Sequence, residues 1–138
     1  MRDLRDEWDG VVPVPSGVTR EFWAATTDGR LLVQRCSDCG EHQFYPRTVC
    51  THCGARDPDY VEAAGTGEVV SYTVCHVPGA AGFGDHTPYA VAIVELAEGP
   101  RMTAHVTGDP DAVAVGAPVS VDFWRVSDDA AIPVFALD

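Results

Sequence analysis

The segments Cys36-Ser37-Asp38-Cys39 and Cys50-Thr51-His52-Cys53 are two C-x-x-C pairs separated by ten residues. Each pair brings two thiols to one turn, and a second pair on a returning hairpin completes a tetrahedron of sulfur ligands around a soft divalent metal. A glycine follows each pair, at Gly40 and Gly54, where the backbone favours a positive φ to pass close to the sulfurs. The spacing predicts a rubredoxin-like zinc ribbon with four ligands, Cys36, Cys39, Cys50 and Cys53.

Four cysteine ligands leave no open coordination position, so the metal is expected to be structural and to activate no water. Two disulfides would use the same thiols but would leave Cys75 over, and the sequence shows no signal peptide, so a reducing, cytoplasmic location is expected. His42 and His52 are alternative ligands that four cysteines make unnecessary. The same thiols also suit iron, and the sequence does not choose between the two metals.

The composition allows one modest core beside the metal module, since 46% of the 138 residues are hydrophobic. No apolar run approaches the roughly 20 residues of a membrane span. All nine basic residues are arginine, against 21 acidic residues, and the formal net charge is −12. This charge repels nucleic-acid phosphates over the surface as a whole. Four arginines nevertheless lie in or beside the metal module, namely Arg30, Arg35, Arg47 and Arg56.

The residues before the metal module are expected to form an arm and a short helix over residues 1–29. Residues 1–18 are charged and then proline-rich, which favours an extended arm that is disordered or lies on a partner. Thr19 is a helix-capping residue type. The helix that follows is too short to be stable alone, so Phe22 and Trp23 must dock on this chain or on another.

The second half of the chain, residues 63–138, alternates short β-rich runs with Gly, Pro and Asp turns. Strands are predicted at residues 68–77, 89–96, 102–107, 119–126 and 133–137. Residues 91–94 are apolar throughout, as in a strand covered on both faces. Five strands suit an OB-fold barrel, so the predicted fold is mainly β, with the zinc ribbon at residues 30–62 followed by this barrel.

Two features of the barrel are candidate contact sites. Trp124 alternates with Phe123 in the predicted strand and should point away from the core. It is expected to face a partner, to cover the end of the barrel or to pack on the ribbon. The glycine-rich loop at residues 78–88 carries Phe83 and His86, and long loops of OB-folds are common binding sites. Because no Ser-His-Asp, P-loop or metalloprotease motif is present, the sequence does not support catalysis by this chain alone.

These motifs, taken in order, resemble those of a bacterial and archaeal family associated with acyl-CoA metabolism and catalogued as domain of unknown function thirty-five. The resemblance covers nearly the whole chain. It runs through Glu21-Phe22-Trp23, residues 31–40, Pro46-Arg47, residues 50–54, residues 65–69, residues 88–96 and Pro133-Val134-Phe135. Each barrel motif is short, but the ordered set is specific.

The resemblance implies an accessory subunit that is not an enzyme on its own. Members of the family look like obligate partners of thiolase-fold enzymes, including acyl-CoA thiolases, acyltransferases and the lipid-transfer-protein-like aldolases of steroid side-chain degradation. The arm and ribbon would dock on the partner, and the barrel would help to form a channel for a CoA thioester. Expected partner contacts are Phe22, Trp23, Phe44, Tyr45 and Trp124. Expected CoA or substrate contacts are Arg35, Arg47, Arg56, Phe83 and His86.

A module that binds single-stranded nucleic acid is the alternative from another class, because OB barrels and zinc ribbons are both common there. Such a module needs a basic groove with stacking aromatic side chains. With a net charge of −12 and no lysine, only the arginines of the ribbon could serve, so the sequence favours the accessory subunit.

Overall fold

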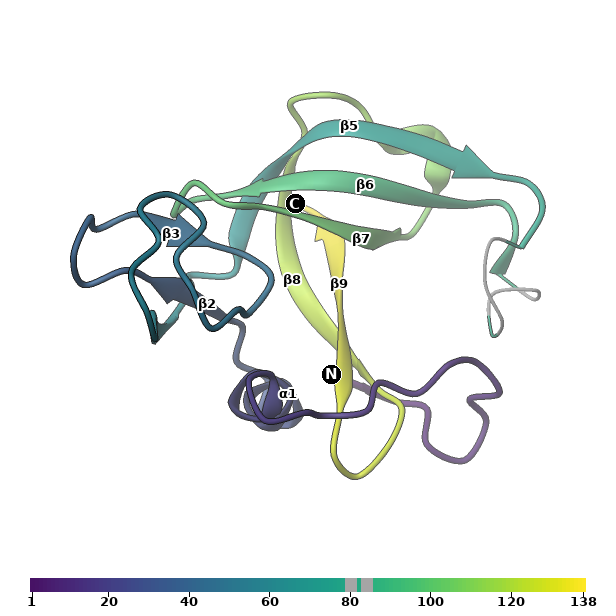
Figure 1. The fold of residues 1–138 in the computed structure, drawn as a ribbon. Coiled ribbons are helices and arrows are strands. Elements are labelled where there is room, and N and C mark those ends of the chain that lie inside the picture. Colours follow the sequence, from purple (N-terminus) through teal and green to yellow (C-terminus); the bar gives the residue numbers. More distant parts are fainter. Residues whose placement is uncertain (79–81, 83–85) are drawn as a thin grey trace.

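Two β-sheets organise the chain in the computed structural model, which describes residues 1–78, 82 and 86–138 (Figure 1). The first is a three-stranded sheet in the ribbon, and the second is a six-stranded sheet that forms the barrel. No helix in these residues combines the length and the apolar character needed to cross a membrane. The elements in chain order are β1 (Arg2–Asp3), α1 (Arg20–Thr27), β2 (Leu32–Arg35), β3 (His42–Gln43), β4 (Asp59–Glu62), β5 (Thr66–Cys75), β6 (Tyr89–Leu96), β7 (Arg101–Thr107), the 3-10 helix η2 (Pro110–Ala112), β8 (Pro118–Arg125) and β9 (Ala131–Leu137).

Strands β5 to β9 close a five-stranded barrel. Neighbours follow the order β8-β5-β6-β7-β9, and β8 also pairs with β9, so the sheet returns to its first strand. These pairs are antiparallel except β7–β9, which is parallel and short. This closed Greek-key barrel is an OB-fold, which confirms the predicted fold class.

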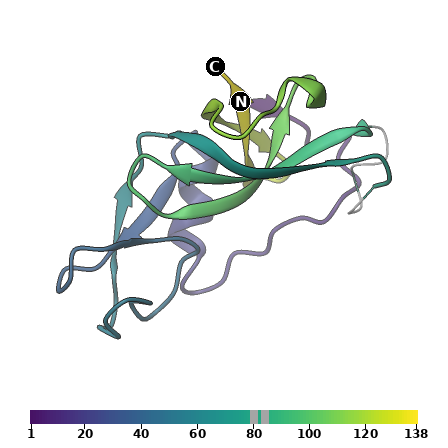
Figure 2. The same ribbon diagram turned by 90° about the horizontal axis from the view of Figure 1, so that it is seen from above.

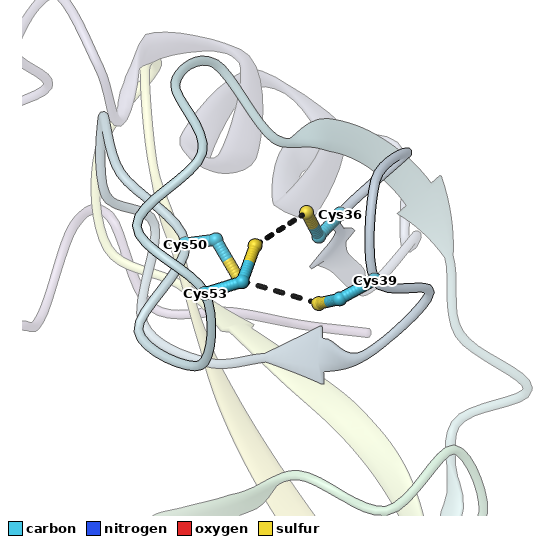
Figure 3. A group of neighbouring side chains, drawn as sticks. All are labelled: Cys36, Cys39, Cys50 and Cys53. Atoms are coloured by element: carbon cyan, nitrogen blue, oxygen red, sulfur yellow. Dashed lines mark hydrogen bonds between the residues drawn. The ribbon is translucent and has the colours of Figure 1, made fainter.

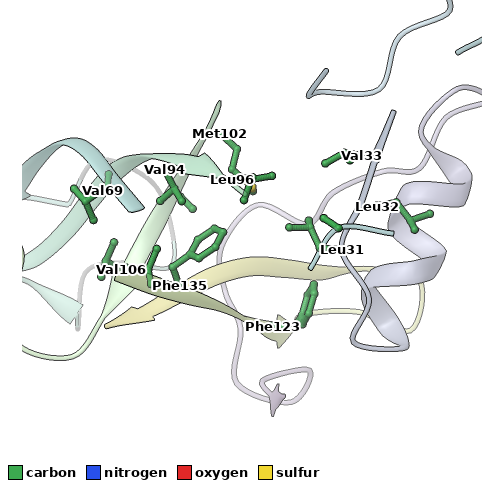
Figure 4. Packing of buried hydrophobic residues seen from close by; sticks show 14 of the residues in the cluster. Leu31, Leu32, Val33, Val69, Val94, Leu96, Met102, Val106, Phe123 and Phe135 are labelled. Carbon is green, nitrogen blue, oxygen red and sulfur yellow. The ribbon is translucent and has the colours of Figure 1, made fainter. Parts of the chain in front are cut away.

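The interior of the barrel is filled by every second side chain of its strands (Figure 4). Val94 of β6, Val106 of β7 and Phe135 of β9 are at most 1% exposed. The prediction that residues 91–94 are buried on both faces is wrong, because Ile93 is 40% exposed. In a small barrel only the inner face of a strand is covered by the core, and the apolar outer side chains of β6 stay at the surface.

Helix α1 docks on its own chain. Phe22 is fully buried and belongs to the same hydrophobic core as Leu31 of the ribbon and Phe135 of the barrel. The hydroxyl of Thr26 accepts the backbone N–H of Ala131 in β9 at 3.0 Å. The helix therefore joins the two modules through one continuous core.

The start of helix α1 differs in one detail from the prediction. Thr19 precedes the helix, but its side chain makes no capping hydrogen bond. Its Oγ1 instead accepts the backbone N–H of Ser16 at 2.9 Å, so the hydroxyl orders the chain before the helix.

The N-terminal arm lies on the barrel of its own chain. Strand β1 pairs in parallel with β8, and the N–H of Leu4 donates to the carbonyl of Arg125 at 2.8 Å. Leu4 and Trp8 pack against Trp124. Figure 2 shows the arm running from α1 to the far end of the barrel, while the loops of the ribbon extend beyond the opposite end. The expectation of a disordered or partner-bound arm therefore does not hold for residues 1–8.

Replacing Thr26 by valine should destabilise the protein by about 1–3 kcal/mol, because the buried N–H of Ala131 would lose its acceptor. The matched control is Thr27→Val in the same helix, where the hydroxyl bonds only to the carbonyl of Ala24 near the surface. That control should stay within about 0.5 kcal/mol of wild type. Urea unfolding measures both, and equal effects of the two variants would contradict the role of Thr26.

Candidate metal centre

Two backbone turns of the same design hold the four cysteines. In the first turn the N–H of Gly40 donates to the carbonyl of Cys36 at 2.9 Å, and in the second the N–H of Gly54 donates to the carbonyl of Cys50 at 3.0 Å. Gly40 and Gly54 have φ angles of 77° and 80°, in the left-handed region that glycine adopts without steric cost. The role predicted for both glycines is confirmed.

The four Sγ atoms lie within 4.8 Å of one another (Figure 3). The Sγ atom of Cys36 is 3.6 Å from that of Cys53, and the Sγ atom of Cys39 is 3.7 Å from that of Cys50. A tetrahedral zinc ion with zinc–sulfur bonds of about 2.3 Å separates its ligands by about 3.8 Å, so this geometry fits one ion. The described cysteines form no disulfide, and neither His42 nor His52 belongs to the group.

The thiols of this group differ in their readiness to ionise. The backbone of Cys53, and then that of His52, donates to the sulfur of Cys50 and lowers the pKa of that thiol to about 6. The backbone of Ala55 acts in the same direction on Cys53, but the neighbouring thiols, Cys36 foremost, raise the pKa of Cys53 to about 12. One thiol thus ionises easily while another resists until a cation neutralises the shared charge. A divalent metal supplies that cation.

Sequence reasoning missed two residues beside this site, Gln34 and Gln43. Both side chains are buried and hydrogen-bond to backbone groups in and before the second cysteine turn. A signal was available, because they are the only side-chain amides in the chain.

The three arginines expected to contact CoA surround the cysteine turns. Arg35 directly precedes the first turn, Arg47 lies between the turns and Arg56 follows the second. All three side chains are exposed, and none of them forms an ion pair within the part of the chain that the structure describes. By contrast, Arg30 pairs with Glu62 at 3.7 Å.

Four of the expected partner contacts form one aromatic cluster, but only part of it is at the surface. The ring of Phe22 lies 4.9 Å from that of Trp23, 5.6 Å from that of Phe44 and 5.5 Å from that of Tyr45, measured between centroids. Phe22 is enclosed by the other three and cannot itself contact a partner. Tyr45 is 37% exposed, and its hydroxyl accepts the indole N–H of Trp23 at 3.0 Å. We call Trp23, Phe44 and Tyr45 the aromatic patch.

Trp124, the fifth expected partner contact, does not lie on the surface. It is 4% exposed because Leu4 and Trp8 of the arm cover it. On another side His105 and His86 approach its ring, with centroid separations of 4.9 and 5.5 Å. The cover is supplied by the arm of the same chain, which none of the expected placements, at a partner, over the end of the barrel or on the ribbon, included.

His86 and His105 line a small cavity of about 320 Å³ on the outside of the barrel. Its other lining residues include Arg2, Tyr89, Asp122 and Trp124. Burial, and then the neighbouring His86, lower the pKa of His105 to about 4, so its imidazole is neutral at neutral pH. Phe83, the other loop residue expected to contact substrate, lies outside the described residues.

A ribbon with four cysteine ligands, followed by an OB-fold barrel, defines the class of this protein. Residues 23–59 match the family model of the "ChsH2, rubredoxin-like zinc ribbon domain", and residues 60–123 match that of the "ChsH2, C-terminal OB-fold domain". The chain belongs to this ChsH2/DUF35 family, as the resemblance predicted. The metal of the ribbon is a structural zinc ion, held by the four cysteines.

Curated relatives fall into two groups by length. A DUF35 domain-containing scaffold protein of Methanocaldococcus jannaschii is 34% identical over 72% of this chain and 71% of its own length. A "Probable enoyl-CoA hydratase alpha subunit" of Thermomonospora curvata is 43% identical over 83% of this chain. The 3-oxo-4,17-pregnadiene-20-carboxyl-CoA hydratase alpha subunit of Mycobacterium tuberculosis is 34% identical over 84%. The chain spans only 36% and 37% of these two hydratase subunits.

Two solved structures share the fold. A chain of an Ltp2-ChsH2(DUF35) aldolase superposes with a TM-score of 0.79 and 38% identity, covering 91% of this chain and 98% of that chain. A DUF35 family protein of unknown function from Sulfolobus solfataricus has a TM-score of 0.64, 20% identity and coverage of 89% and 87%, and it supports the fold alone.

The purified chain should contain one zinc ion, and Cys39→Ala should remove most of it because three ligands hold zinc more weakly. Cys75→Ala is the control, since Cys75 is free and lies outside the four-cysteine group. Elemental analysis of both variants measures the zinc content per chain. Zinc loss from Cys75→Ala equal to that from Cys39→Ala would contradict the assigned ligand set.

Acid should destabilise the protein partly through His105. The folded pKa is about 4, whereas an unfolded histidine binds its proton with a pKa of about 6.5. The unfolded chain therefore takes up the proton first, and the stability present above about pH 6.5 is lost as the pH falls toward 4.

The measurement is the loss of urea-unfolding free energy between about pH 7 and about pH 5, which should be smaller in His105→Gln than in wild type. The exposed His76, replaced in His76→Gln, provides the control and should leave the loss unchanged. An unchanged loss in His105→Gln would exclude this histidine as the source.

Proposed function

We propose that this chain is a non-catalytic accessory subunit of a thiolase-fold acyl-CoA enzyme, such as an aldolase of steroid side-chain degradation. The observation that carries the proposal is the match to a chain of the Ltp2-ChsH2(DUF35) aldolase, with 38% identity over 98% of that chain. The names of other relatives, "scaffold protein" and "alpha subunit", support a role beside a partner.

The chemistry of the metal centre favours a role in which this chain does not catalyse the reaction itself. A zinc ion with four cysteine ligands has no position for a substrate or for a reactive water. We therefore assign bond making and breaking to the partner, and to this chain the stabilisation of that partner.

The aromatic patch is the proposed contact with the partner. Large aromatic side chains with a polar group at one end are enriched at the centres of protein interfaces. Tyr45 and Trp23 have this character, and Tyr45 is 37% exposed. The core packing of Phe22 and the hydrogen bond of Thr26 fix helix α1 to the rest of the chain. The aromatic patch is therefore held in place before a partner binds, which lowers the entropy cost of binding.

The arginines around the cysteine turns are the proposed contacts for the phosphates of CoA. A guanidinium group binds a phosphate through two parallel hydrogen bonds. Arg35, Arg47 and Arg56 are exposed and free of ion pairs within the described residues, so their donors are available. His86 at the cavity beside Trp124 is proposed to face the acyl part of the ligand. Phe83 of the same loop stays a proposed substrate contact that lies outside the described residues.

The residues on one face of the barrel disfavour the nucleic-acid alternative. OB-folds bind oligonucleotides on the outer side of their second and third strands. In this chain these strands are β6 and β7, whose outward residues include Val91, Ile93 and Thr103. Arg101 at the edge of this face is paired with Glu95 at 3.3 Å. Arg101 is the only arginine of these two strands, so β6 and β7 do not supply the basic groove that single-stranded nucleic acid requires.

Recovery of the tagged chain from its host should yield a thiolase-fold protein in fixed ratio, with cleavage activity on β-hydroxyacyl-CoA or β-ketoacyl-CoA substrates.

Tyr45→Ala should weaken partner binding at least tenfold, because interface aromatic residues commonly contribute about 2 kcal/mol or more. Tyr72→Ala is the matched control, since Tyr72 is 41% exposed on the barrel and lies outside the patch. Recovery of nucleic acid, or equal effects of the two variants, would refute the proposal.

Arg35→Ala, Arg47→Ala and Arg56→Ala should each weaken binding of a CoA ester to the assembled complex by about threefold to tenfold, the loss of one exposed phosphate contact. Arg101→Ala on the barrel serves as the control and should leave the affinity unchanged. Calorimetric titration with a non-hydrolysable CoA ester measures each dissociation constant. If all three ribbon variants bind as wild type does, these arginines do not contact CoA.

A further inference from the structure

Gln34 and Gln43 form a buried pair beside the metal centre. They are the only glutamines of a chain that has no asparagine, and their side chains are 2% and 5% exposed. Gln34 of β2 lies opposite Gln43 of β3 in antiparallel register, and Nε2 of Gln43 donates to Oε1 of Gln34 at 2.8 Å. Burying two amides is costly unless they are fully hydrogen-bonded, so the remaining bonds of the pair indicate its role.

Gln34 binds both backbone groups of one residue ahead of the second cysteine turn. Its Oε1 accepts the N–H of Arg47 at 2.8 Å, and its Nε2 donates to the carbonyl of Arg47 at 2.9 Å. Arg47 belongs to no strand, and the amide of Gln34 takes the place that a neighbouring strand would occupy. The segment that enters the second turn is thereby attached to β2.

Gln43 binds the second cysteine turn itself, on both sides of Cys50. Its Oε1 accepts the N–H of Thr51 at 2.8 Å and the hydroxyl of Thr51 at 3.2 Å. Its Nε2 also donates to the carbonyl of Val49 at 3.3 Å. An amide side chain offers an acceptor oxygen and a donor nitrogen side by side without carrying a charge.

The two cysteine turns differ in how the backbone supports them. Both turns have the same internal bond, from the N–H of Cys36 to the carbonyl of Glu41 at 3.0 Å and from the N–H of Cys50 to the carbonyl of Ala55 at 2.7 Å, but only the first turn joins two paired strands, β2 and β3. The second turn lies in the irregular segment between β3 and β4, where the isolated bridge between Val49 and Arg56 connects the segment to itself. Among the side-chain hydrogen bonds described, those of the glutamine pair attach this segment to the sheet.

We propose that Gln34 and Gln43 are positioning residues of the zinc site, which hold the second cysteine turn against the first. The four cysteines supply the metal ligands, and the glutamines act through the backbone on either side of Cys50. The same bonds fix both ends of the segment that carries Phe44 and Tyr45, so the pair also links the zinc site to the aromatic patch.

The test is zinc release from the full-length, zinc-loaded protein into an excess of a chromogenic chelator. Gln43→Met keeps the length of the side chain and removes its hydrogen bonds. It should weaken zinc binding by about tenfold to hundredfold, the usual effect of losing a residue that orients metal ligands. The absorption spectrum of the cobalt-substituted variant should still show four thiolate ligands, which would separate lost positioning from a lost ligand.

Two further variants decide whether the effect is specific. Val33→Ala removes a side chain that is 1% exposed on β2, next to Gln34, and has no hydrogen-bonding group, so it should destabilise the fold but leave zinc release near wild type. Gln43→Glu keeps the acceptor for Thr51 but places a buried carboxylate oxygen against the oxygens of Gln34 and Val49, so it should release zinc at least as fast as Gln43→Met. Release at the wild-type rate from Gln43→Met and Gln43→Glu, or equal acceleration by Val33→Ala, would overturn the proposal. If Gln43→Met does not fold, the comparison of zinc release between Gln43→Glu and Val33→Ala tests the proposal in its place.

Discussion

The packing of helix α1 between the two sheets is the constraint on which the rest of the structure depends. Phe22 is buried against the aromatic patch on one side and joins the core of the barrel on the other. The hydroxyl of Thr26 fixes the helix to β9. A helix of eight residues has little stability of its own, so both sheets must be in place for it to form. The orientation of the ribbon relative to the barrel therefore follows from one short element.

Features encoded by local pattern were predictable from the sequence. The spacing of the four cysteines and their two glycines is sufficient to define a metal site, because its geometry is set within a few residues of each ligand. Strand β6 has the predicted bounds, Tyr89–Leu96, and the other barrel strands lie within about two residues of their predicted positions, since turn residues separate them clearly.

Features that depend on distant parts of the chain were not predictable in the same way. Alternation along β8 correctly placed Trp124 outside the barrel, but only the arm, from the other end of the chain, determines that Leu4 and Trp8 bury it. The uncovered outer face of β6 has the same cause, since a run of apolar residues does not reveal whether a second layer exists. For Gln34 and Gln43 the partners are backbone groups of an irregular segment, for which sequence has no periodic signal.

The arm also changes how the barrel meets its surroundings. Strand β5 pairs with only the first residues of β8, Pro118 to Ser120, and then diverges, which leaves the far part of this edge without a barrel neighbour. Strand β1 occupies that edge at Trp124 and Arg125. Open strand edges pair readily with strands of other molecules and promote aggregation. The first residues of the chain thus complete the wall of the barrel. They keep an unpaired strand edge and the indole of Trp124 out of contact with other molecules.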